Sequence, residues 1–241
     1  MEGSIQTGTL SSSLSIFEDA ARLLCTASLV WWLNSHHIPS SISDYFAQRH
    51  LFGGAITSTF PLRFQDVSNI RPVPNHQVLG DPERDESLIF ELLELKHDVA
   101  DYGSATWFLQ DLATEQDAER VMIIEQSGVI EFDGLRFRNL PAVVTTAVGQ
   151  MAISKEGQGR EAQNTVRVYL ANLRLREVFT DVLITAYEPI LISPLSDSAS
   201  TVGAGLPVPA AQSGCVPMAE VFQLAVSSFK VNDWSLFGPD G

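Results

Sequence analysis

The second half of the chain carries strand-like segments separated by turns, and this pattern constrains the fold most. The segments span residues 143–153, 165–175 and 178–187, with Glu177 at the last turn. Strands joined by a turn as short as this one must run antiparallel, because a parallel crossover needs about a dozen residues or more. The chain is therefore expected to build an antiparallel sheet.

The middle segment changes its apolar parity part-way along. Apolar residues occupy alternate positions from Val166 to Leu170, but Leu173 and Leu175 fall on the opposite parity. One extra residue in a strand reverses the direction of every later side chain. The pattern therefore predicts a β-bulge near residues 171–172.

Helix and strand signals compete in the segment Ser87–Leu95. Its leucine and glutamate residues favour a helix, whereas its alternating apolar positions favour a strand, so the period alone leaves both states open. Earlier in the chain, an apolar–polar alternation follows Leu51 and stops at Pro61. This second pattern indicates a strand.

Two segments have helical periodicity. One is Ala219–Phe229, and the other is Tyr102–Ala113, whose apolar stripe contains Tyr102, Ala105, Leu109 and Leu112. Strands in series with two separated helices favour the α+β class, in which helices cover one antiparallel sheet.

The chain divides into an extension and a domain. Residues 1–49 are serine-rich at their start and are predicted to be poorly ordered or a short helix, with the domain spanning 50–241. The apolar run within residues 20–33 is too short to cross a bilayer, which takes about 20 residues. Residues 193–217 contain much Ser, Ala, Gly and Pro with almost no charge, and they predict a flexible insertion.

The net charge and the cysteine content restrict the classes of partner and the compartment that fit this chain. A net charge of −14 repels phosphates, which argues against nucleic acid and against membranes as main partners. It suits a basic protein surface, although acidity can also serve solubility alone. Cys25 and Cys215 lie far apart, which is neither a disulfide framework nor a metal-ligand set and fits a reducing compartment.

Motifs for catalysis are missing from the sequence. There is no phosphate-binding loop of the Walker type, no HExxH, no CxxC and no Gly-x-Ser-x-Gly elbow. The histidines lack an obvious partner for a metal site, and the plentiful carboxylates are typical of solvated faces. We therefore expect no catalytic residue, no metal and no cofactor, and a protein that acts by binding.

The run from Asp66 to Val78 is the strongest candidate for recognition. Pro72 and Pro74 stiffen it, and a stiff loop loses little entropy when its polar side chains bind a partner. The structural alternative is a rigid connector between two strands.

A series of ordered sequence blocks extends from Leu51 to about Pro239. The blocks are Leu51–Ile56, Pro61, Asp66–Ser68, Arg71–Pro74 with Gln77, Asp85–Glu94, Thr180–Leu183 and Trp234–Gly238. Together they resemble the Ran guanine-nucleotide-release factor family, the MOG proteins. Several blocks at compatible spacing are more specific than one short motif.

The resemblance implies a fold and a function. The fold is an α/β/α sandwich with a central six-stranded antiparallel sheet flanked by helices, similar to the PsbP proteins, and it makes 87–95 a strand. The function is binding of Ran GTPase, release of its guanine nucleotide and support of nuclear protein import. The expected location is the nucleus and cytoplasm, with other Ran regulators as further candidate partners. The alternative is a PsbP-like ligand-binding or scaffold module without a GTPase partner.

The resemblance also implies a Ran-binding surface around the proline loop. Its candidate residues are Asp66, Arg71, Pro74, Asn75, Gln77, Val78 and Asp81. Family members usually show Pro-Asp-x-Gln-Glu here, and both acidic positions are replaced in this chain, by Asn75 and Val78. Each lost charge-assisted hydrogen bond costs about 1.5–3 kcal/mol, so weaker Ran binding is expected unless a nearby acid substitutes. Arg71 has two interpretations, a contact to Ran or an internal anchor of the loop.

Overall fold

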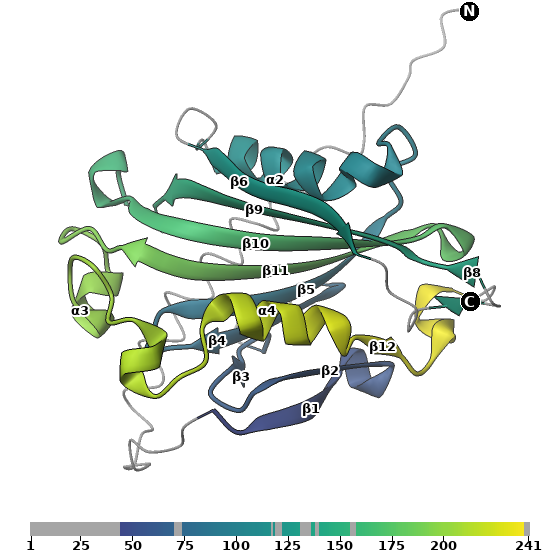
Figure 1. The fold of residues 1–241 in the computed structure, drawn as a ribbon, viewed down its shortest axis with the longest axis horizontal. Coiled ribbons are helices and arrows are strands. Elements are labelled where there is room, and N and C mark those ends of the chain that lie inside the picture. The colour runs from purple at the N-terminus through teal and green to yellow at the C-terminus, as the bar shows by residue number, and fades with distance from the viewer. Residues whose placement is uncertain are drawn as a thin grey trace, which may run out of the picture.

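The centre of the molecule is one large antiparallel sheet (Figure 1). Its strand order is β3-β4-β5-β11-β10-β9-β6. Its strands are β3 (Gln65–Asp66), β4 (His76–Asp81), β5 (Glu86–Glu94), β6 (Ile123–Ile130), β9 (Val143–Ile153), β10 (Asn164–Leu175) and β11 (Thr180–Leu191). The computed structural model describes residues 44–69, 74–116, 118, 122–130, 136–137, 140–154 and 158–238.

The α+β class is confirmed, with seven rather than six strands in this sheet. The count is higher because β3 extends the sheet beyond β4 through the pairs Gln65 with Gly80 and Asp66 with Leu79. The strand predicted at 87–95 is also confirmed, as β5.

Smaller elements complete the fold. A second sheet has the order β1-β2-β12, from β1 (Phe46–Leu51), β2 (Ile56–Pro61) and β12 (Lys230–Val231). In a third, two-stranded sheet β7 (Arg136–Phe137) pairs antiparallel with β8 (Leu140–Pro141). Within the described residues the α-helices are α2 (Ser104–Glu115), α3 (Ser198–Val202) and α4 (Met218–Ser227). The 3-10 helices described there are η1 (Phe52–Gly54), η2 (Asp101–Gly103), η4 (Arg160–Ala162), η5 (Arg176–Val178), η6 (Ala210–Ser213) and η7 (Trp234–Phe237).

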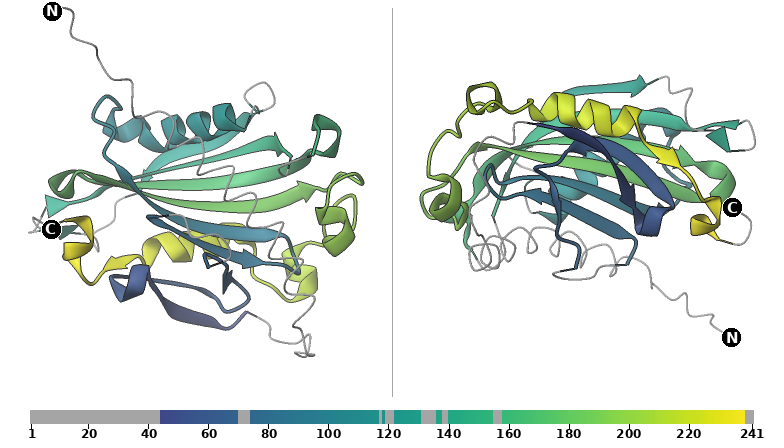
Figure 2. Two further views of the ribbon diagram at one scale, coloured as in Figure 1. Left: turned by 180° about the vertical axis from the view of Figure 1, so that it is seen from behind. Right: turned by 90° about the horizontal axis from the view of Figure 1, so that it is seen from below.

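The layers follow from the apolar faces of the two longer helices. α2 packs on β9 and β10 on one face of the central sheet, and α4 lies on the other face between β11 and β2 (Figures 1 and 2). Both predicted helices are therefore confirmed. The predicted stripe of the first helix is buried at Ala105, Leu109 and Leu112, but Tyr102 belongs to η2 and is 77% exposed.

The predicted bulge at 171–172 is wrong. β10 pairs with β11 in one register from Val166 to Leu175, and the register shift lies between Thr165 and Val166. The parity of the apolar residues changes because this strand is buried on both faces. Val168 packs in the cluster under α2, whereas Leu173 packs in the cluster under α4.

The domain begins earlier than the predicted boundary at residue 50. β1 starts at Phe46 and pairs with β2 along its whole length, and Asp44 forms an ion pair with Arg63 at 2.8 Å. Residues 1–43, including the apolar run at 20–33, lie outside the described residues. Among the residues that are described, no helix is long and apolar enough to cross a membrane.

The segment 193–217 is more regular than the predicted flexible loop. It contains α3 and η6, and Ile192 exchanges two backbone hydrogen bonds with Gly205 at 2.8 and 2.9 Å. The buried Asn164 side chain donates to the hydroxyls of Ser196 and Ser198, both at 3.0 Å. These bonds attach the segment to the start of β10.

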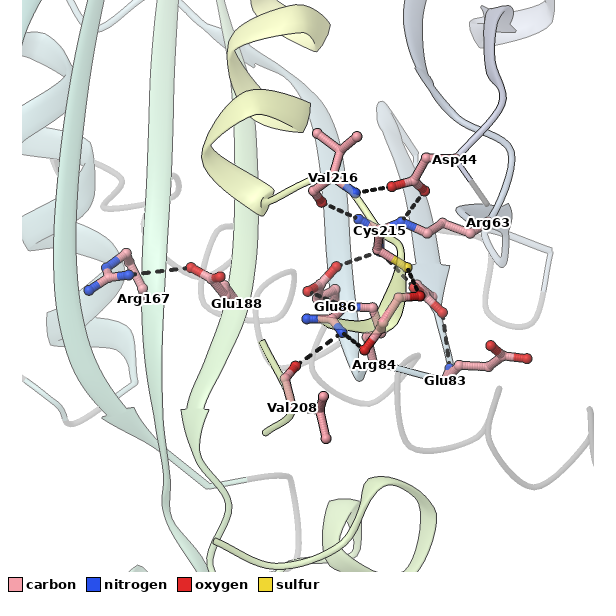
Figure 3. A network of polar contacts seen from close by, with 12 residues as sticks. Asp44, Arg63, Glu83, Arg84, Glu86, Arg167, Glu188, Val208, Cys215 and Val216 are labelled. Carbon is pink, nitrogen blue, oxygen red and sulfur yellow. Dashed lines mark hydrogen bonds and ion pairs between the residues drawn. The ribbon is translucent and has the colours of Figure 1, made fainter. Parts of the chain in front are cut away.

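A buried arginine joins distant parts of the chain (Figure 3). Arg63 bonds the carboxylates of Asp44 at 2.8 Å, Asp81 at 2.7 Å and Glu86 at 2.5 Å. It also donates to the carbonyl of Val216, whose backbone N–H donates to Asp44. The ion pairs therefore connect the end of β2, the β4–β5 hairpin and the chain that leads into α4.

Glu115 of α2 is a carboxyl in a poorly solvated position. One of its oxygens is buried without a hydrogen-bond partner. Burial, together with the negative charges of Asp111 and Glu91, raises the pKa of Glu115 to about 8, although Lys96 acts in the opposite direction. The folded protein therefore favours the protonated form of this side chain.

We expect Arg63→Met to lower the free energy of unfolding by about 3–5 kcal/mol, because it leaves buried carboxylates without their cation. Urea unfolding followed by tryptophan fluorescence measures the loss. Arg176→Met is the control, because Arg176 is 61% exposed and its ion pair with Asp101 lies at the surface. Equal losses in the two variants would contradict a structural role for the Arg63 network.

We expect Glu115→Gln to stabilise the protein at alkaline pH and to change little in acid. The pKa of this carboxyl rises from 4.5 to about 8 on folding, so its ionisation destabilises the fold increasingly as the pH rises through that window. The gain should be about 1–2 kcal/mol at about pH 9, after allowance for the partial exposure of the side chain. Thermal unfolding at about pH 5 and about pH 9 measures it, and equal gains at both pH values would contradict the assignment.

Candidate protein-binding site

The candidate surface lies where β3 ends and β4 begins. Asp66 is exposed, and its carboxylate accepts a hydrogen bond from the backbone N–H of Ser68 at 2.9 Å. Its second oxygen accepts from the side-chain amide of Gln77 at 2.6 Å. A negative charge is thus held in one orientation while it stays open to solvent.

Gln77 links Asp66 to the turn that follows β1. Its amide oxygen accepts from the backbone N–H of Phe52 at 2.7 Å, while its amide nitrogen donates to Asp66. Because both ends of the amide are hydrogen-bonded, Gln77 fixes the distance between the carboxylate and the η1 turn.

Pro74 and Asn75 form an exposed turn before β4. Asn75 has a φ of 63°, a left-handed conformation that asparagine tolerates better than most residues. Its carbonyl accepts from the backbone N–H of Leu92 at 2.9 Å. The imidazole of His76 contacts the Pro74 carbonyl at 2.8 Å through Nδ1 and the buried Glu91 carboxylate at 2.5 Å through Nε2. The turn is therefore fixed to the sheet, with the Asn75 side chain outside.

Two of the predicted residues do not reach this surface. Val78 is 2% exposed and packs in a small apolar cluster with Ile89, Val67 and Tyr187. It points to the opposite face from Gln77 because successive residues of a strand alternate. Asp81 is 3% exposed and is paired with Arg63.

The described candidates thus separate into two groups. Asp66, Pro74, Asn75 and Gln77 come together at the start of β4, whereas Val78 and Asp81 serve the interior. Arg71 lies outside the described residues, so both of its interpretations stay predictions. Within the described ranges, no group of three or more His, Cys, Asp or Glu side chains is placed to hold a metal ion.

A pocket next to this surface was not predicted. It has a volume of about 770 Å³ and lies between the η1 turn and the η7 turn. The sequence signals that could have found it are the Gly53–Gly54 pair and the polar residues before Trp234. Its lining residues are His50, Phe52, Gly53, Gly54, Ala55, Asp233, Ser235 and Leu236.

Comparisons with known proteins bear on the identity of the chain. The family model described as "Ran-interacting Mog1 protein" matches residues 49–189. The chain is 31% identical over 204 residues to a probable Ran guanine nucleotide release factor from Dictyostelium discoideum, covering 81% of this chain and 98% of that protein. It is 33% identical over 190 residues to the Ran guanine nucleotide release factor from Homo sapiens, covering 78% and 95%.

A solved structure supports the fold. The Ran-binding protein Mog1p from Saccharomyces cerevisiae matches with a TM-score of 0.57 and 24% identity, over 81% of this chain and 100% of that chain. The family model spans more than half of the 241 residues, and the relatives match along nearly their whole length. The chain therefore belongs to the Mog1 family.

Proposed function

We propose that this protein binds the small GTPase Ran and promotes release of its guanine nucleotide, in support of nuclear protein import. The names of the relatives support this function, since they are Ran guanine nucleotide release factors and nuclear import proteins. The structural observation that carries it is the exposed Asp66 carboxylate, held by Ser68 and Gln77 on a strongly acidic chain. The protein acts by binding and not by catalysing a covalent step.

The mechanism depends on differential affinity. A release factor must bind nucleotide-free Ran more tightly than loaded Ran, because a ligand shifts an equilibrium only by the difference in its affinities. The fixed carboxylate of Asp66 engages basic side chains near the nucleotide pocket of Ran. Lysines or arginines paired with a carboxylate hold the phosphates of the nucleotide less well, and release becomes faster.

Asp66 carries this role because the other acidic positions predicted for the proline loop and β4 are replaced or buried. Asn75 keeps an exposed side chain that can form hydrogen bonds but has no charge, and Val78 points into the protein. Asp81 is committed to Arg63. Asn75, Pro74 and Gln77 form the remainder of the contact surface, and Arg71 contributes either to it or to the loop.

The net charge of the protein and its expected location in the nucleus and cytoplasm fit this role. The net charge of −14 complements a basic partner surface and raises the association rate. Cys215 is a free thiol, which suits the reducing nucleus and cytoplasm in which Ran acts. Other Ran regulators are further candidate partners at the same step.

The function is tested by nucleotide release from Ran loaded with a fluorescent GTP analogue. The full chain should accelerate release in a manner that rises and saturates with concentration. Neither acceleration nor binding would contradict the proposal and would favour a ligand-binding or scaffold role for the fold.

We expect Asp66→Asn to weaken Ran binding by about 2- to 5-fold, the effect of one exposed charge pair, and to slow release in parallel. Asparagine can still accept the hydrogen bond from Ser68 through its one oxygen, which keeps the turn, whereas its amide nitrogen cannot accept from Gln77, so the bond from Gln77 is lost together with the charge. Glu83→Gln is the matched control, because it removes the same charge from an exposed residue beyond the opposite end of β4. Equal binding by both variants would exclude Asp66 from the interface.

A further inference from the structure

The pocket between the η1 and η7 turns has walls from distant parts of the chain. His50 and residues 52–55 form one wall, and Asp233, Ser235 and Leu236 form the other, around a volume of about 770 Å³. No step in the function proposed above uses this space.

The two walls are fixed to each other. The backbone N–H groups of Asn232 and Asp233 both donate to the Ala55 carbonyl, at 2.8 and 3.1 Å. The side-chain amide of Asn232 donates to the Gly54 carbonyl at 3.3 Å, and β12 pairs with β2 just before it. The half-buried Leu236 packs against the core under α4. The pocket is therefore preformed, which lowers the entropy cost of filling it.

The charge at the pocket comes from Asp233, which is exposed to solvent. One oxygen of its carboxylate accepts hydrogen bonds from the Ser235 hydroxyl at 2.7 Å and from the Ser235 backbone N–H at 3.0 Å. These bonds lower the pKa of Asp233, so the side chain is ionised at neutral pH. The lining contains no lysine or arginine. The complementary ligand is therefore a cation that can donate hydrogen bonds.

The opposite wall leaves room for a long side chain. Gly53 and Gly54 have φ values of 67° and 98°, which favour glycine, and a Cβ added at Gly53 would meet no atom within 4 Å. Phe52 shares the left-handed conformation with a φ of 50°, although a bulky residue rarely adopts it. Strained backbone of this kind is often kept at binding sites.

The pocket is continuous with the candidate surface. Phe52 lines it, and the backbone N–H of Phe52 donates to Gln77, which donates in turn to Asp66. One glutamine thus holds the pocket wall and the exposed carboxylate in a fixed relation. A partner that contacts Asp66 has this pocket beside the contact.

We propose that this pocket accepts a lysine or arginine side chain of Ran, as a second contact of the interface centred on Asp66. The inference rests on the proposed Ran binding and adds to it a defined subsite and the class of side chain that fills it. The charge complementarity of Asp233 and the preformed walls carry it.

The first test compares Asp233→Asn with the unchanged full chain in equilibrium titrations against Ran. Asparagine keeps an oxygen that accepts from Ser235, so η7 is preserved, while the charge is removed. Binding should weaken by about 2- to 5-fold at low salt, and the difference should shrink as salt screens the pair. Glu220→Gln, an exposed acid in the first turn of α4, controls for net charge and should bind as the unchanged chain does.

The outcomes separate the two proposals. Failure of the unchanged chain to bind Ran overturns the proposed function and the pocket inference together. Ran binding that is weakened by Asp66→Asn but not by Asp233→Asn overturns the pocket inference alone.

A second test identifies the side chain in the pocket. Single Lys→Ala and Arg→Ala variants of Ran are combined with Asp233→Asn in double-mutant cycles. One basic residue should show a loss of affinity that is not additive with the loss from Asp233→Asn. Additive losses for every basic residue would overturn the inference, even if Asp233→Asn alone weakens binding.

Discussion

Burial of the central strands on both faces determines where every other element lies. In β10, Val168 faces α2 while Ala171 faces α4, so the sheet needs a helix on each side. The apolar face of α4 packs on β11 and on β2 of the small sheet, while its outer face, with Glu220 and Gln223, stays exposed. The middle of the sheet is thereby closed to partners. Exposed polar groups that can bind a protein collect where strands end, and the start of β4 is such a place.

Periodicity predicted the antiparallel sheet and both longer helices, because these depend on local alternation and turn length. Periodicity failed where burial or pairing with a distant segment determines the local structure. Because β10 is buried on both faces, its apolar residues change parity, and this change was misinterpreted as a bulge at 171–172. β1 escaped prediction because Gln48, Arg49 and His50 interrupt any alternation, and only its pairing with β2 makes it a strand. The segment 193–217 looked flexible because its anchor, Asn164, lies outside it.

The candidate site was located in part. Asp66 and Gln77 lie within the proline-stiffened run that the sequence singled out, and the structure brings their side chains together. The sequence could not show that Asp81, unlike Asp66, is buried. Its burial depends on its ion pair with Arg63, a residue 18 positions away that no local pattern connects to it. The inward direction of Val78 follows from strand parity, but only once the limits of β4 are known.

The hydrogen bonds of Gln77 explain how a chain without the acidic pair of its family can still present an ordered acidic surface. A mobile carboxylate must be ordered when it binds, whereas Asp66 is already held by Ser68 and Gln77. The same amide fixes the η1 turn through Phe52, so the separation between Asp66 and the Asp233 pocket is set by the fold and not by the partner. If Ran binds as proposed, two acids at a fixed spacing would select a partner whose basic side chains match that spacing, which gives specificity that net charge alone cannot provide.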